Sequence, residues 1–175
     1  MTAWTERLGS RDKPRVGLAW SGNPGQKNDR NRSIPFGNIE PLLNLDVDWH
    51  TLQTEIRDSD LGLLSRAPRL RIWSDEITGF ADTAGLIQHL DLVVTVDTSI
   101  AHLAGAMGKP TWILLPYAAD WRWLTERSDR PSYPSVRLWR QKTPGDWESL
   151  IRLIKTELEL HFGVGARKPV EGRLD

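Results

Sequence analysis

The sequence has no cysteine, so it can form neither a disulfide framework nor a thiolate metal site. No window approaches the roughly 18 consecutive apolar residues that a transmembrane helix needs, which excludes a membrane span. The opening stretch MTAWTERLGSRDKPR lacks the apolar centre of a signal peptide. The whole chain has 23 Lys and Arg against 23 Asp and Glu, so nothing suggests a nucleic-acid partner, and any anion site must be local. We therefore expect a soluble, cytoplasmic protein.

Chemistry that depends on clustered ligands or a catalytic triad is also missing from the sequence. The four histidines, His50, His89, His102 and His161, are scattered and give no metal-ligand pattern. No Ser/His/Asp arrangement has a convincing local context, and no catalytic base stands out. We expect no metal and leave the catalytic residues unassigned.

Apolar segments of strand length alternate with segments of helical periodicity along the 175 residues. This alternation predicts one α/β domain, a Rossmann-like doubly wound parallel sheet of about six strands in the order 3-2-1-4-5-6. We expect a polar leader at 1–13, the domain at 14–161 and a flexible tail at 162–175. The expected strands are 15–20, 49–53, 70–73, 92–96, 111–115 and 136–139, and the expected helices are 35–45, 59–65, 78–90, 99–107 and 147–161. Ligands of such sheets bind beyond the carboxyl ends of the strands.

The segment VDTSIAH ends the buried strand at 92–96 and opens an amphipathic helix. Asp97, Thr98 and Ser99 are all N-cap residue types, so they could simply cap that helix. Alternatively, the first-turn N–H groups, the hydroxyls and the positive end of the helix dipole could hold a phosphate. Asp97 would repel a phosphate, so we assign it an orienting role. His102 lies off the apolar stripe of Ile100, Leu103, Ala104 and Met107 and could contact the ligand or be a surface residue.

The loop SGNPGQKNDRNRS follows the first expected strand and opens onto the same crevice. Its cations Lys27, Arg30 and Arg32 outnumber its single acid, Asp29, among small hydrogen-bonding residues such as Ser21. The loop could be an ordinary solvated surface, or it could neutralise a diphosphate. It matches neither the G-x-G-x-x-G dinucleotide fingerprint nor a Walker loop.

Two further strand ends carry polar or aromatic side chains. Gln53 and Glu55 end the second strand, where they could address a ribose or cap the next helix. The segment PYAADWRW after the fifth strand brings Tyr117, Asp120 and Trp121 towards the crevice. These rings could stack on a base or a sugar, or only pack the edge of the domain.

Several of these segments together resemble one protein family. VTVDTSIAHLAGAMGKPTWILL is similar to the donor-binding segment of bacterial heptosyltransferase-like (family 9-type) glycosyltransferases, with its pattern D-T-x-x-x-H-L-A-x-A-x-x-x-P. GLAWSGNPGQKNDRNRSIPF, WRWL and the later W-R-Q resemble the variety often fused to tetratricopeptide repeats. The resemblance covers most of the chain, from Pro14 to Leu158.

The resemblance implies the C-terminal, donor-binding half of a GT-B fold and inverting transfer from a nucleotide sugar, with no bound cofactor or metal. Thr98 and Ser99 would bind the diphosphate through their backbone, and His102 would approach it. Arg32 falls nearest to the family's phosphate-binding lysine, with RSIP in place of Lys-Arg-Trp-Pro. Gln53 stands about where some relatives have a ribose-binding acid. Both positions depart from the family pattern.

In this family the catalytic base and the acceptor site come from the other domain. The resemblance therefore implies donor binding without appreciable transfer, with an acceptor domain or tetratricopeptide repeats supplied in cis or in trans. Two alternatives stay open: a non-catalytic binding module that keeps the half-fold, and another nucleotide-sugar enzyme such as an epimerase.

Overall fold

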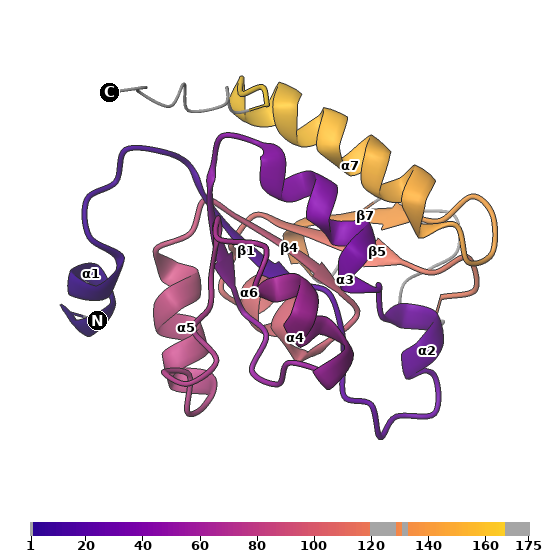
Figure 1. The fold of residues 1–175 in the computed structure, drawn as a ribbon, viewed down its shortest axis with the longest axis horizontal. Coiled ribbons are helices and arrows are strands. Elements are labelled where there is room, and N and C mark those ends of the chain that lie inside the picture. Colours follow the sequence, from indigo (N-terminus) through magenta and orange to yellow (C-terminus); the bar gives the residue numbers. More distant parts are fainter. Residues whose placement is uncertain (1, 120–128, 131–132, 167–175) are drawn as a thin grey trace.

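A single sheet organises the computed structural model, which describes residues 2–119, 129–130 and 133–166 (Figure 1). Its strand order is β3-β2-β1-β4-β5-β7-β6, and every neighbouring pair is parallel except β6 and β7. The predicted fold class and the order 3-2-1-4-5-6 are confirmed for the six parallel strands, to which β6 adds a short antiparallel edge. The strands are β1 (Arg15–Ala19), β2 (Asp48–Thr51), β3 (Leu70–Arg71), β4 (Leu92–Val96), β5 (Thr111–Leu115), β6 (Asp129–Arg130) and β7 (Tyr133–Arg140).

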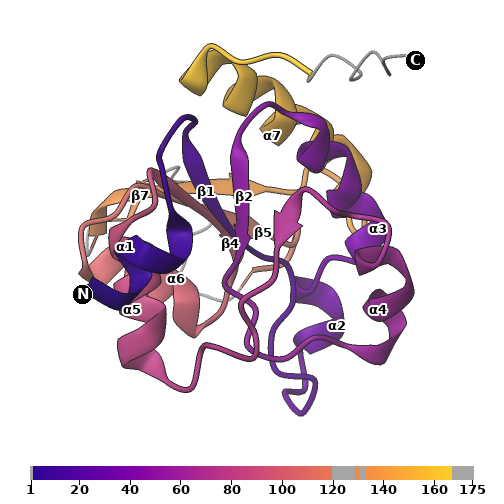
Figure 2. The ribbon, with the colours of Figure 1, turned by 60° about the vertical axis from the view of Figure 1, so that its left-hand side comes forward.

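Helices cover both faces of the sheet, which is why β1, β4 and β5 are buried along their whole length. One face carries α3 (Phe36–Ile39), the 3₁₀ turn η1 (Glu40–Asn44), α4 (Asp58–Leu64) and α7 (Trp147–Phe162). The other face carries α1 (Thr2–Leu8), α5 (Phe80–Gln88) and α6 (Ser99–Ala106). Figure 2 shows the two helical layers on either side of the strands.

The longest helix, α7, has a clear beginning and end. Asp146 caps its first turn by accepting a hydrogen bond from the Ser149 N–H at 3.0 Å. Gly163 ends it in the left-handed conformation (φ 63°), which favours glycine. Beyond it, Ala166 pairs with Leu45, so the stretch expected as a tail begins with residues that contact the domain. None of the described helices is long and apolar enough to cross a membrane.

The polar opening residues include the short helix α1, which docks on the sheet through buried Trp4 and Leu8. The Trp4 ring meets Trp73 edge-on, with centroids 5.4 Å apart. Arg15 donates hydrogen bonds to the carbonyls of Gly9 and Ser10, at 2.9 and 3.0 Å, just past the end of the helix. Cations suit this end of a helix because its last carbonyls have no partners within it.

His50 lies beneath this helix on β2 and is completely buried. Its Nδ1 accepts a hydrogen bond from the Trp73 indole N–H at 3.1 Å, so the ring carries no proton there. Burial, assisted by the charges of Arg71 and Arg15, lowers the pKa of His50 to about 4. We call these four residues, Arg15, His50, Arg71 and Trp73, the α1 anchor.

Three local expectations were wrong. The stretch after β1 is not entirely loop, because it contains the short helix α2 (Asp29–Arg32). The helical spacing of Phe80, Ala84, Ile87 and Leu90 predicts that these residues face the core. Phe80 is instead 65% exposed, since α5 begins at this residue and its buried side comprises Thr83, Leu86 and Ile87. In α6 the buried stripe is Ile100, Ala101, Ala104 and Gly105, while Met107 follows the helix and is exposed.

Candidate functional site

A cleft of about 400 Å³ opens beyond the carboxyl ends of β1, β2 and β4, where the predicted strand order places a ligand site. Residues 21–23 after β1 and residues 53–55 after β2 form one side of it. Residues 98–100, at the start of α6, form another side, and residues 77–80 close it in front of α5.

The start of α6 presents unused hydrogen-bond donors to this cleft. Thr98 precedes the helix in an extended conformation (φ −138°, ψ 176°), and its side chain does not cap the helix. Its hydroxyl lies 3.3 Å from that of Thr95 instead. The N–H groups of Ser99 and Ile100 have no acceptor in the described part of the chain. First-turn N–H groups and the helix dipole make such a turn suited to an anion.

Gln53 lines the cleft and is only 6% exposed, and its carboxamide makes hydrogen bonds to other groups of the protein. Its oxygen accepts from the backbone N–H groups of Trp20 and Ser21 at 3.2 and 3.3 Å. Its nitrogen donates to the carbonyl and hydroxyl of Ser21 and to the Glu55 carbonyl. Gln53 therefore ties the ends of β1 and β2 together, and Ser21, which lines the cleft, shares that role.

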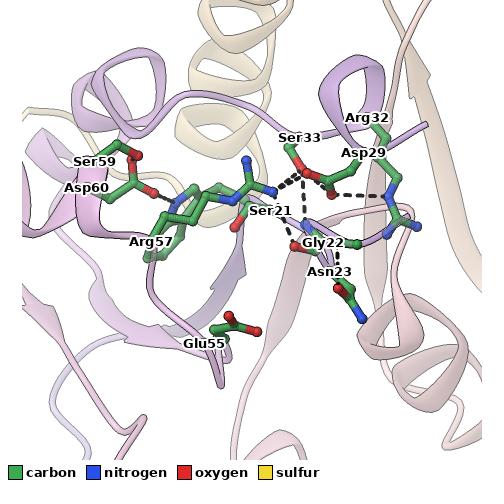
Figure 3. A network of polar contacts seen from close by, with 12 residues as sticks. Ser21, Gly22, Asn23, Asp29, Arg32, Ser33, Glu55, Arg57, Ser59 and Asp60 are labelled. Atoms are coloured by element: carbon green, nitrogen blue, oxygen red, sulfur yellow. Dashed lines mark hydrogen bonds and ion pairs between the residues drawn. The ribbon is translucent and has the colours of Figure 1, made fainter. Parts of the chain in front are cut away.

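A network of polar contacts surrounds Asp29, which is buried at 5% exposure (Figure 3). Its carboxylate accepts from the Ser33 hydroxyl at 2.9 Å and pairs with the Arg57 guanidinium. Arg32 Nε lies 3.6 Å from the same carboxylate, and Figure 3 shows the two arginines approaching it from opposite sides. We call Asp29, Arg32, Ser33 and Arg57, with the backbone of Gly22, the Asp29 cluster.

The cations predicted for the diphosphate lie in different surroundings. Arg32 is largely buried and donates from Nη1 to the Asp97 carbonyl at 2.9 Å, next to the turn that holds Thr98. The Asp97 carbonyl therefore holds the Arg32 guanidinium beside this turn. Lys27 is exposed on the loop and does not line the cleft.

Of the remaining predicted residues, His102 and Tyr117 do not line the cleft. His102 faces Asp97, with Nε2 4.0 Å from the carboxylate, and its ring lies edge-on to Tyr133. Tyr117 is 54% exposed after β5, and its backbone N–H donates to Gln141 at 3.1 Å. Asp120 and Trp121 lie outside the described residues.

Sequence reasoning missed Ile77, Phe80 and Arg57 as contributors to this region, and it gave Glu55 only as one of two polar residues at the end of the second strand. Glu55 is exposed and lines the cleft, and within the described chain its carboxylate has no hydrogen bond or ion pair. Ile77 and Phe80 supply apolar surface opposite the strands. Arg57, 28 residues after Asp29, completes the Asp29 cluster, and no local pattern marks that pairing.

The cleft is chemically simple. Among its described lining residues, Glu55 is the one acidic or basic side chain, so the cleft offers no acid/base pair. Over residues 2–119, 129–130 and 133–166, no three His, Cys, Asp or Glu side chains gather as metal ligands would. The arrangement can bind a ligand that combines an anion, hydroxyl groups and a flat apolar part.

Comparisons with known proteins agree with this picture. Residues 77–116 match the model of glycosyltransferase family 9 (heptosyltransferase). Protein FlbA of Caulobacter vibrioides is 29% identical over 161 residues, which are 89% of this chain and 26% of FlbA. The chain thus spans about a quarter of the length of that curated relative.

The fold is similar to that of the E. coli ADP-heptose lps heptosyltransferase II. The TM-score is 0.61 at 15% sequence identity, and the match covers 91% of this chain and 51% of that structure. At this identity the likeness concerns the fold. Together with the family match over β4, α6 and β5, it confirms the resemblance drawn from the D-T-x-x-x-H-L-A segment.

Proposed function

Because the chain holds a heptosyltransferase-like domain of the glycosyltransferase family 9 type, we propose that its cleft binds the nucleoside-diphosphate part of a sugar donor. The observation that carries the proposal is the start of α6, where the N–H groups of Ser99 and Ile100 face the cleft without acceptors. A diphosphate would supply those acceptors and would suit the positive end of the helix dipole.

Other parts of the cleft fit the rest of such a ligand. Glu55 can accept hydrogen bonds from sugar hydroxyls, a part for which the sequence pattern offered Gln53 and Glu55 and the family resemblance pointed to Gln53. Ile77 and Phe80 offer apolar surface for the flat base. Arg32 adds positive charge behind the Asp97–Thr98 turn without entering the cleft.

In a complete enzyme this domain would hold the donor during inverting transfer and stabilise the charge of the departing diphosphate. We propose that these residues alone bind the donor without appreciable transfer, because the described cleft offers no acid/base pair. The acceptor and its base would come from another domain, or from tetratricopeptide repeats, in the cytoplasm. The lack of an acid/base pair also favours donor binding over the chemistry of an epimerase. The second candidate function is a non-catalytic module that binds a ligand with the same half-fold.

The test is to titrate the chain with ADP, UDP, GDP and inorganic pyrophosphate, following backbone amides by NMR. We expect amides 98–102 to shift on binding. Ser99→Pro removes one N–H at the first helical position, where proline is tolerated, and Thr98 already has the extended conformation preferred before proline. Losing one hydrogen bond to a charged group should weaken binding by about tenfold or more.

Ser99→Ala is the matched control, since it keeps the N–H and removes only the hydroxyl. We expect its affinity to stay within about threefold of the unaltered chain. Two results would contradict the proposal: no shift at 98–102 with any of these compounds at millimolar concentration, or undiminished affinity in Ser99→Pro.

A further inference from the structure

We infer that Asp29 is a positioning residue, which fixes Arg32 against the anion end of the cleft. The inference rests on the proposed function, because it concerns the same diphosphate. Asp29 itself lies outside the cleft, and its carboxylate could only repel a phosphate there. Its contribution would therefore run through the groups that it holds in place.

The Asp29 cluster joins three segments that lie far apart in the sequence. Ser33, at the end of α2, accepts a hydrogen bond from the Gly22 N–H at 3.1 Å, and Arg57 donates to the Gly22 carbonyl at 3.2 Å. Gly22 follows β1 and lines the cleft, whereas Arg57 follows β2. Arg32 then connects the same carboxylate to the Asp97 carbonyl after β4. The cluster thus fixes the chain beyond three neighbouring strands.

Close packing leaves Arg32 little freedom. A Cβ atom added at Gly22 would lie 2.4 Å from Arg32 Nη2 and 2.7 Å from its Cζ, so the guanidinium rests directly on the Gly22 backbone. Asp29 faces its Nε side, and the Asp97 carbonyl accepts from Nη1. A guanidinium held on three sides keeps its charge next to Thr98, and little side-chain entropy remains to be lost when an anion binds.

Charge counting and positioning predict opposite effects when Asp29 is neutralised. Asp29→Asn removes a negative charge near the anion, and by Coulomb attraction alone the phosphate should bind more tightly. If Asp29 acts by holding Arg32, the same change frees the guanidinium and binding weakens. The sign of the change therefore separates positioning from a simple contribution to local charge.

The experiment measures the Kd of pyrophosphate and of ADP by calorimetry, at constant pH and salt, for the full chain and its variants. We expect Asp29→Asn to weaken pyrophosphate by about tenfold, the size expected when a charge-assisted contact is lost. Arg32→Gln should weaken it similarly, and the double variant should be no weaker than either single one, because both changes remove the same held cation. Asp29→Glu, which keeps the charge, should recover part of the loss.

Asp46→Asn is the matched control. This change also neutralises an acid that pairs with a cation, here Lys13 at 2.6 Å. Asp46 precedes β2, however, so it lies at the end of the strands opposite to the cleft. Should Asp29→Asn fail to fold, Ser33→Ala removes the hydroxyl shared by Asp29, Arg57 and Gly22, and we expect the same direction of change.

Unchanged or tighter binding in Asp29→Asn, or additive losses in the double variant, would overturn the inference while leaving the proposed function intact. If the unaltered chain binds neither pyrophosphate nor ADP at millimolar concentration, the proposed function fails and the inference fails with it. A Tm lowered in Asp29→Asn with an unchanged Kd would show a purely structural role and also overturn it.

Discussion

The α1 anchor lies on β1, β2 and β3 and the Asp29 cluster lies beyond the ends of β1 and β2, and the two hold their buried polar groups in opposite ways. In the α1 anchor, Arg15 donates to main-chain carbonyls and His50 is held neutral, so no acid is needed. In the Asp29 cluster, two arginines share one buried carboxylate and touch the backbone of cleft segments. The α1 anchor lies away from the cleft, so its polar groups can only stabilise the fold. The Asp29 cluster has more cations than acids and lies beside the cleft, so it can also act on a ligand.

The difference teaches where variants should act. Changes in the α1 anchor should lower the free energy of unfolding and leave ligand binding unaltered, because the anchor lies beneath α1 and away from residues 98–100. Changes in the Asp29 cluster should alter binding more than stability. Three further predictions, in falling order of expected effect on stability, test this division.

Trp4→Ala, which removes the ring packed on Trp73 of the α1 anchor, should cause the largest loss of stability. Trp4 is 4% exposed, meets Trp73 edge-on and lies directly on Gly85 of α5, where an added Cβ would come within 2.7 Å of its ring. Truncating a buried aromatic residue typically costs about 3–5 kcal/mol. Urea unfolding measures the loss, and the affinity for ADP should stay constant. A Kd that changes in step with stability would break the division between the two regions.

Acidification should remove about 3 kcal/mol of stability through His50, from the difference between its usual pKa and a pKa of about 4 in the fold. Above about pH 6.5 the ring is neutral in both folded and unfolded chains, so it gives no pH dependence. As the pH falls, His50 is protonated in the unfolded chain, whereas in the folded chain it stays neutral until about pH 4. Stability is therefore lost progressively between these two values.

His50→Gln is the comparison for this measurement, because its amide oxygen can still accept from Trp73 but does not titrate. Urea unfolding at several pH values between 7 and 4 should give a smaller slope for this variant than for the unaltered chain. Equal slopes would mean that the burial of His50 does not govern its proton binding.

Gly22→Ala should have the smallest effect on stability, about 1 kcal/mol or less, because the new methyl group displaces the end of the long Arg32 side chain and meets no backbone atom. Its effect on pyrophosphate should be larger, since Arg32 must leave the Asp97 carbonyl. Gly62→Ala is the control, as nothing lies within 4 Å of the added Cβ on α4. Thermal unfolding and calorimetry on both variants would show whether binding and stability separate here.

Much of the fold followed from the sequence because its strands are continuous apolar runs. Leu92–Val96 and Thr111–Leu115 have the predicted bounds, since strands buried on both faces carry no charged residue that blurs their ends. The weaker edge was harder: β3 is only Leu70–Arg71, because an edge strand has one partner to define its length. Phe80 misled the periodicity because its ring faces the cleft rather than the core.

The candidate site was predictable only where it is local. Thr98 and Ser99 were found because a strand end and a helix start adjoin in the sequence. Gln53 is hydrogen-bonded to Ser21, and Arg57 forms an ion pair with Asp29. Both contacts join segments that only the folded chain brings together. Composition alone therefore predicted that the loop has more cations than acids, but not which cation is fixed beside the cleft.

The central place of β1 also bears on how the chain folds. β1 is made before both of its neighbours in the sheet, and Val16 pairs on one side with Trp49 and on the other with Leu92. The middle of the sheet can close only after the ribosome has released β4, and until then the apolar edge of β1 lacks its second neighbour. Long-range parallel pairing of this kind is slow, so we expect the meeting of β1 and β4, rather than the formation of any helix, to limit the speed of folding.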